Sequence, residues 1–143
     1  MTMLAWSDDY SVEIEEIDEQ HKQLVALINK LYDALARKQQ RDEISTVLDE
    51  LVDYTKVHFA VEECLMRIFH YPEYDAHKAI HDDIVGKVIT FQSQYHAGND
   101  KVGMELLMFL KDWLMDHINK VDKAYVPHLT KHGVKRKWLK KFW

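Results

Sequence analysis

The sequence predicts an all-α protein, an up-down-up-down antiparallel four-helix bundle with an N-terminal arm and a short C-terminal helical tail. Its 143 residues include only 4 Gly and 2 Pro, too few for the many tight turns of a fold built from short strands. Four long stretches repeat apolar side chains at the spacing of one helix face. The segments between these stretches are short, and short connections make consecutive helices antiparallel neighbours.

The first two helices are expected at residues 18–38 and 41–69. Asp18 is the predicted N-cap of the first helix, because its carboxylate can accept a hydrogen bond from a free N–H group of the first turn. The second helix should end before Tyr71, since the residue that precedes a proline is pushed out of the helical region. The apolar positions that define these two helices are Leu24, Val25, Ile28, Leu31 and Leu35, then Ile44, Val47, Leu48, Leu51, Leu65 and Phe69.

The third and fourth helices are expected at residues 73–96 and 100–124. The third should stop at Gly98-Asn99, and the fourth before Pro127. Their apolar positions are Ile84, Val88, Phe91 and Tyr95, then Leu106, Leu107, Leu110 and Leu114. The expected domain organisation is therefore a bundle at 1–125, with 1–17 as the arm, and a basic, aromatic tail at 126–143.

Charge and cysteine content restrict the class of protein. Residues 1–122 hold all 24 acidic residues but only 12 of the 19 Lys and Arg, so this part carries −12 and the rest +7. A body of that sign disfavours nucleic-acid binding. The single Cys64 excludes an internal disulfide and suits a reducing compartment, and the first ten residues lack a secretory signal, so the expected location is the cytoplasm.

Polar residues occupy positions on the apolar faces where a core side chain is expected. Each helix directs at least one potential metal ligand towards the bundle interior. These residues, with one more acidic position at the end of the fourth helix, are His21, His58, Glu62, His77, His81, His117 and Asp122.

The spacing of these residues brings several of them together. His58 and Glu62, and likewise His77 and His81, are four residues apart and lie on one helix face. His117 and Asp122 are five apart, an offset of about 140° on a regular helix. Both can reach one site only if the helix changes its pitch between them or if the Asp122 side chain reaches round the helix. A single-turn π-bulge is one way to change the pitch.

Burying all seven groups without a cation would be costly. A single buried histidine is ordinarily a neutral ring hydrogen-bonded to a carbonyl group. Five imidazoles and two carboxylates buried together would leave many polar atoms without a hydrogen bond, and each such atom costs on the order of 1–3 kcal/mol. The net stability of a domain is only about 5–15 kcal/mol. The remaining histidines, His70, His96, His128 and His132, lie at helix ends or in the tail and are expected to be structural, as is Cys64.

The ligand set favours two transition metals. Seven ligands are too many for one tetrahedral zinc and too rich in nitrogen for magnesium or calcium. With two bridging carboxylates and one oxo or hydroxo bridge, five histidines leave one of two octahedral metals with an open position. The Glu-x-x-His pairs of carboxylate-rich di-iron enzymes are absent from the sequence. A site rich in histidine should favour reversible exchange of electrons with dioxygen over cleavage of the O–O bond.

Several motifs resemble those of the hemerythrin family, most closely its single-domain bacterial members, the bacteriohemerythrins. The resemblance covers about residues 6–125, includes the aromatic arm with Trp6 and Tyr10, and matches all seven candidate ligands in order and spacing. The matching segments are Ile17-Asp18-Glu19-Gln20-His21, His58-Phe59-Ala60-Val61-Glu62-Glu63, Tyr71-Pro72 leading to His77-Lys78-Ala79-Ile80-His81, and Trp113-Leu114-Met115-Asp116-His117 with Asp122.

The resemblance implies a non-haem di-iron centre with an oxo or hydroxo bridge. His77, His81 and His117 would bind one iron and His21 and His58 the iron with the open position, while Glu62 and Asp122 would bridge the pair. Dioxygen would bind the open iron, take up two electrons and be held as a hydroperoxide. An apolar oxygen pocket would be formed by Phe59, Trp113 and Leu114, although plain core packing also explains these three residues.

The predicted function is reversible binding of dioxygen for carriage, storage or delivery, by a monomer that is not an enzyme. The alternatives are sensing of oxygen, nitric oxide or redox state, iron handling, or weak di-iron oxidase or peroxidase activity. In the tail, Val134, Trp138 and Phe142 recur at helical spacing among basic residues. This edge is expected to pack on the acidic bundle or to contact an anionic membrane or an acidic partner weakly.

Overall fold

The computed structural model describes residues 4–131, apart from the side chains of Val121 and Thr130. Its helices are a 3-10 turn at Asp8–Tyr10, α1 at Glu15–Ala36, α2 at Arg41–Ile68, α3 at Tyr74–His96, α4 at Val102–His117, a π-helical segment at Ile118–Asp122 and α5 at Lys123–Lys131. The predicted amphipathic edge of the tail, Val134 to Phe142, lies outside the described residues.

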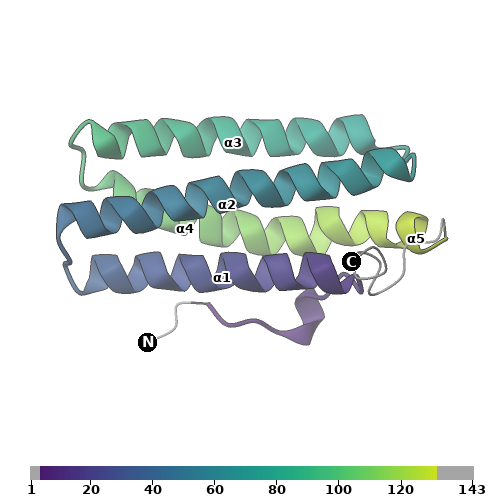
Figure 1. Ribbon diagram of the computed structural model, residues 1–143, viewed down its shortest axis with the longest axis horizontal. Helices are drawn as coiled ribbons and strands as arrows, with labels where there is room; N and C mark the ends of the chain where they lie inside the picture. Colours follow the sequence, from purple (N-terminus) through teal and green to yellow (C-terminus); the bar gives the residue numbers. More distant parts are fainter. Residues whose placement is uncertain (1–3, 132–143) are drawn as a thin grey trace, which may run out of the picture.

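The four long helices run side by side and alternate in direction, as Figure 1 shows. α1 packs against α2 and α4, and α3 packs against the same two helices, so the four form a closed bundle. The arm before α1 lies along the outside of that helix (Figure 1). The predicted all-α bundle is confirmed. No helix in the described part of the chain is long and apolar enough to cross a membrane.

The end of α3 was predicted correctly from its glycine. Gly98 has a φ of +109°, a conformation that side chains with a Cβ rarely adopt. The Gly98 N–H donates to the Tyr95 carbonyl, and the Asn99 N–H donates to the Gln94 carbonyl at 3.1 Å. This pair of bonds is the Schellman arrangement that satisfies the last free carbonyl groups of a helix.

The predicted role of Asp18 as an N-cap is wrong. α1 begins three residues earlier, at Glu15, and the N-cap position is occupied by Ile14, whose side chain makes no capping bond. The Asp18 carboxylate instead accepts hydrogen bonds from the Val12 N–H at 2.8 Å and the Ser11 hydroxyl at 2.5 Å. Asp18 therefore ties the arm to the bundle, and acidic side chains in the first turn stabilise the positive end of the helix.

The fourth helical stretch was expected to stop before Pro127, but it continues past this residue. It passes through the π-helical segment and continues as α5, with Pro127 inside the helix. A proline removes one backbone hydrogen bond and bends a helix, but packing on either side can keep the chain helical. Here Tyr125 and Leu129 are both buried against the arm and α2 in one apolar cluster.

The core divides into two apolar clusters with the polar residues between them. On α1, Ile17 belongs to the cluster near the arm and Leu24 to the larger central cluster, and His21 lies between these two positions. The same order is repeated on α2, where Phe59 and Leu65 flank Glu62. The bundle therefore encloses one polar layer, covered by apolar side chains on both sides.

Candidate metal centre

The polar layer contains all seven residues that the sequence singled out. Each of them is buried, with at most 3% of its surface exposed. Their ligand atoms form two groups, and within each group these atoms lie no more than 4.8 Å apart. The groups are His77, His81, His117 and Asp122, and then His21, His58, Glu62 and Asp122. Asp122 belongs to both groups, so the two sites are adjacent and share one carboxylate.

The first group is a cluster of three imidazoles around one carboxylate. The Nε2 atom of His81 lies 3.1 Å from the Nε2 atoms of both His77 and His117. The Asp122 Oδ1 atom is 2.8 Å from His117 Nε2 and 3.3 Å from His77 Nε2. Nitrogens that bind one metal at right angles, each at about 2.1 Å, lie about 3.0 Å apart. The spacing of the three rings therefore fits one shared cation.

The second group has two imidazoles and two carboxylates. His58 Nε2 lies 2.5 Å from Glu62 Oε1, one helical turn along α2. His21 Nε2 on α1 lies 3.1 Å from Asp122 Oδ2 and 4.0 Å from Glu62 Oε1. The two oxygens of Asp122 thus face different histidine groups, which is the geometry that a bridging carboxylate needs.

The π-helical segment brings Asp122 to this position. It covers Ile118–Asp122 and begins directly after His117. In a π-helix the backbone bonds join residues five apart, so His117 and Asp122 come to lie on the same side of the helix. The predicted change of pitch between these two residues is confirmed.

Several buried polar atoms in the layer form no hydrogen bond of good geometry, although some of them lie within 3.1 Å of one another. In a neutral imidazole each nitrogen either donates or accepts a hydrogen bond. The Nε2 atoms of His77, His81 and His117, which meet at one point, therefore cannot all satisfy one another. Unpaired buried atoms of this kind are rare unless a cation binds them. On the side where the ligand atoms meet, they are His21 Nε2 and both carboxylate oxygens of Glu62 and of Asp122. The donor set fits two metal ions that prefer nitrogen and carboxylate ligands.

The ionisation states of three candidate ligands also suit the binding of cations. Burial lowers the pKa of His81 to about 4, which keeps its ring neutral and able to donate a lone pair. Burial opposes ionisation of Glu62 and Asp122, yet the neighbouring imidazoles hold the pKa of Glu62 below its usual value and that of Asp122 well below it. Neutral rings and charged carboxylates are the forms in which these side chains bind metals.

Hydrogen-bond partners of the candidate ligands were missed in the sequence. Gln20 Oε1 lies 2.7 Å from His58 Nδ1, and Glu63 Oε2 lies 3.0 Å from His81 Nδ1. Such partners orient the ring and fix which nitrogen carries the proton. Both residues are direct neighbours of candidate ligands along the chain, and this proximity is the signal that could have indicated them.

The candidate oxygen-pocket residues surround the histidine rings. Phe59 stacks on His81, with ring centroids 3.8 Å apart, and Trp113 stacks on His117 at 4.5 Å. Leu114 is buried one turn before His117. It borders a small internal cavity of about 10 Å³, which is lined by Leu24, Ile28, Leu51, Thr55, Leu110, Trp113 and Leu114.

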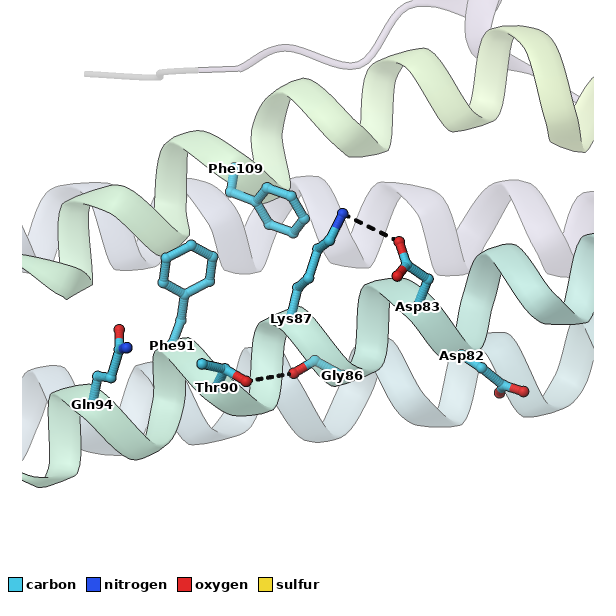
Figure 2. Close-up of a pocket in the computed structure, with 8 residues that line it drawn as sticks. All are labelled: Asp82, Asp83, Gly86, Lys87, Thr90, Phe91, Gln94 and Phe109. Atoms are coloured by element: carbon cyan, nitrogen blue, oxygen red, sulfur yellow. Dashed lines mark hydrogen bonds and ion pairs between the residues drawn. The ribbon is translucent and has the colours of Figure 1, made fainter.

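A larger hollow of about 610 Å³ lies elsewhere, on the outer surface between α3 and α4. Figure 2 shows Phe91 and Phe109 facing each other across it, with Lys87 paired to Asp83 at one side. None of the seven candidate ligands lines this hollow. Because all seven side chains are buried, the candidate metal site lies in an enclosed layer and not in this surface hollow.

The other described histidines have ordinary partners or exposed positions. His96 lies 2.9 Å from the Asp49 carboxylate on the surface, and His128 donates to the Phe69 carbonyl at 2.7 Å. His70 and Cys64 are exposed. None of these four residues belongs to either group of ligand atoms, and His132 lies outside the described residues.

Comparison with known proteins identifies the family. Residues 12–129 match the Hemerythrin HHE cation binding domain. The chain belongs to the hemerythrin family. Among the relatives of this hemerythrin chain is the bacteriohemerythrin of Methylococcus capsulatus (strain Bath), which is 39% identical over 91% of the chain and 99% of the relative. The bacteriohemerythrin of Pseudomonas aeruginosa (strain PAO1) is 44% identical over 88% of the chain and 81% of the relative.

Solved structures agree with this assignment. A crystal structure of wild-type hemerythrin superimposes with a TM-score of 0.84 at 38% sequence identity, over 90% of this chain and 99% of the other. Residues 12–129, which the family model matches, include the four long helices and the polar layer between them. The resemblance noted in the sequence is thus confirmed for the family and for the fold.

Proposed function

We propose that this hemerythrin binds dioxygen reversibly at a non-haem di-iron centre in the polar layer. The observation that carries the proposal is the pair of four-residue ligand groups that share the Asp122 carboxylate. Five imidazoles and two carboxylates match the ligand preference of a pair of irons better than that of zinc or of calcium.

The ligands are assigned according to the two groups. His77, His81 and His117 would hold the iron whose coordination is complete, which we call the three-His iron. His21 and His58 would hold the other, the two-His iron, which keeps one position open. Glu62 and Asp122 would bridge the pair, and the orphaned oxygens of both carboxylates support this role.

When bound, two ferrous ions with one open position supply the two electrons that dioxygen takes up reversibly. The buried imidazoles and carboxylates of the layer would hold these ions and keep bulk water away from them. Phe59 and Trp113 stack against the rings of His81 and His117, and Leu114 closes the layer on the side of the central core. These three residues would form the apolar oxygen pocket.

A binding role is favoured over an enzymatic one by the small size of the cavity that the pocket residues Trp113 and Leu114 line. The cavity next to Leu114 has a volume of about 10 Å³, room for about one water-sized molecule. A diatomic ligand suits such a space, whereas an organic substrate of an oxidase needs a much larger pocket. We therefore propose carriage, storage or delivery of dioxygen, with sensing as the second candidate.

The visible spectrum of the iron-loaded protein tests this proposal. Metal analysis is expected to find about two irons per chain, as the ligand count requires. The reduced protein should develop a visible absorption band in air and lose it again when oxygen is removed. A single iron, predominant zinc, or a colour change that degassing does not reverse would contradict reversible binding at a di-iron centre.

We further propose that the chain is a monomer in the cytoplasm and that its basic tail contacts the chain's own acidic body. Residues 132–143 include five Lys and Arg and no acidic residue, whereas residues 1–122 carry −12. Opposite charges of this size attract one another over about 8 Å at physiological salt. An anionic membrane or an acidic partner protein would attract the same residues.

Deletion of residues 132–143 should lower the melting temperature by about 2–4 °C, the amount expected for the loss of about 1 kcal/mol. Calorimetry of both proteins measures this change, and sedimentation with anionic vesicles in low and high salt provides the comparison. The intact protein is expected to stay in solution. Unchanged melting, together with salt-sensitive vesicle binding that disappears on deletion, would place the tail on a membrane surface instead.

A further inference from the structure

The outward-facing nitrogens of the candidate ligands have different partners in the two groups. In the three-His group, His81 Nδ1 faces the carboxylate of Glu63 at 3.0 Å. In the other group, His58 Nδ1 faces the amide oxygen of Gln20 at 2.7 Å. His21 Nδ1 and His117 Nδ1 have no hydrogen-bond partner among the described residues. A negative charge therefore stands behind one group, and a neutral dipole behind the other.

Glu63 is held in place from both sides. Its side chain is 16% exposed, and its two oxygens have different partners. Oε2 accepts the hydrogen bond of the His81 ring, and Oε1 lies 3.5 Å from the Lys78 ammonium group. Lys78 also pairs with Asp82 at 2.9 Å, so its charge is divided between two carboxylates. The Glu63 charge is thus only partly offset by Lys78.

A carboxylate behind a metal-binding histidine has two effects. It fixes the orientation and tautomer of the ring, and it makes the coordinating nitrogen a stronger electron donor. A stronger donor nitrogen stabilises the metal ion of higher charge, here ferric iron relative to ferrous iron. A neutral amide such as that of Gln20 provides the orientation without the charge.

We propose that Glu63 is a positioning residue that directs His81 and, through its charge, makes the three-His iron the one that stays ferric longer during reduction. This inference rests on the proposed di-iron function and adds the order in which the two irons are reduced. The two-His iron, with Gln20 behind His58, is reduced first. The three-His iron follows in the second one-electron step.

The test is a reductive titration of the diferric, iron-loaded protein, with dithionite as electron donor and the visible spectrum as readout. Glu63→Gln keeps an oxygen that can accept the His81 hydrogen bond but removes the charge. The potential of the second one-electron step is expected to rise, because the ferric ion loses its stabilisation. A tenfold loss of the preference of the three-His site for ferric over ferrous iron equals about 59 mV for one electron.

Two further variants keep the test informative if Glu63→Gln binds iron poorly. Lys78→Gln removes the cation beside Glu63 and leaves the bond to His81, so the second potential should fall. Lys87→Gln is the matched control, since Lys87 forms the same kind of pair with Asp83 on α3 at 3.2 Å, in the surface hollow away from the candidate ligands. This variant should leave both potentials unchanged.

The inference is overturned if Glu63→Gln retains two irons and both of its potentials equal those of the unaltered protein. An unchanged second potential in Lys78→Gln also overturns it. Failure of the proposed function would look different, because the unaltered protein would then bind fewer than two irons or fail to reverse its colour. A protein that binds oxygen reversibly but shows no shift in the variants contradicts only the role of Glu63.

Discussion

Replacement of His77 by alanine is expected to remove at least one iron per chain and to lower the melting temperature by about 10 °C. The Nε2 atom of His77 lies 3.1 Å from His81 Nε2 and 3.3 Å from the Asp122 carboxylate, within the three-His group. Bound metal contributes directly to folding free energy when its ligands are buried together. Loss of one partner from a buried charged cluster costs about 3–5 kcal/mol, and each kcal/mol shifts melting by about 2–4 °C in a chain of this size.

His96→Ala is the matched control, because His96 lies on the same helix. Its ring pairs with Asp49 on the surface, where both side chains are 43% exposed. Surface pairs of this kind contribute about 0–1 kcal/mol, so iron content and melting should both stay close to those of the unaltered protein. Metal analysis and calorimetry of the two variants measure the difference. If His77→Ala kept two irons and its full melting temperature, His77 would be an ordinary core histidine.

The bundle was predictable because its helices are long and strongly periodic. Positions such as Leu24, Ile28 and Leu31 repeat over several turns, and the positive φ of Gly98 ends α3 where its residue type indicates. The helix starts were harder to predict. Asp18 has the residue type of an N-cap, but its carboxylate binds the backbone of the arm, a contact between segments that no local pattern reveals.

The candidate ligands were predictable for a similar reason, since the spacing of His58 and Glu62 already places both on one helix face. The five-residue interval from His117 to Asp122 predicted a change of helical pitch, and the structure contains a π-helical segment at this place. The hydrogen bonds from Gln20 and Glu63 were not predictable, because they depend on the rotamers of side chains on neighbouring helices. The continuation past Pro127 was missed, since buried neighbours on both sides outweigh the lost backbone bond.

Leu114→Ala is expected to speed oxidation of the oxygenated protein to its diferric form by about tenfold, while two irons remain bound. Leu114 is buried one turn before His117 and borders the small cavity beside the polar layer. Loss of its branched side chain enlarges that cavity, so water and protons can reach the site more easily. A tenfold change in rate corresponds to about 1.4 kcal/mol in the barrier.

Leu110→Ala separates this effect from general loosening of the core. Leu110 lines the same cavity and is equally buried, at 3% exposure, but it lies one further turn away from His117. Both changes should destabilise the protein by a similar amount, about 2–5 kcal/mol, because each removes the same buried atoms. Only Leu114→Ala should shorten the lifetime of the oxygenated spectrum in air. Equal lifetimes for the two variants, or a lifetime in Leu114→Ala as long as that of the unaltered protein, would show that Leu114 does not guard the site.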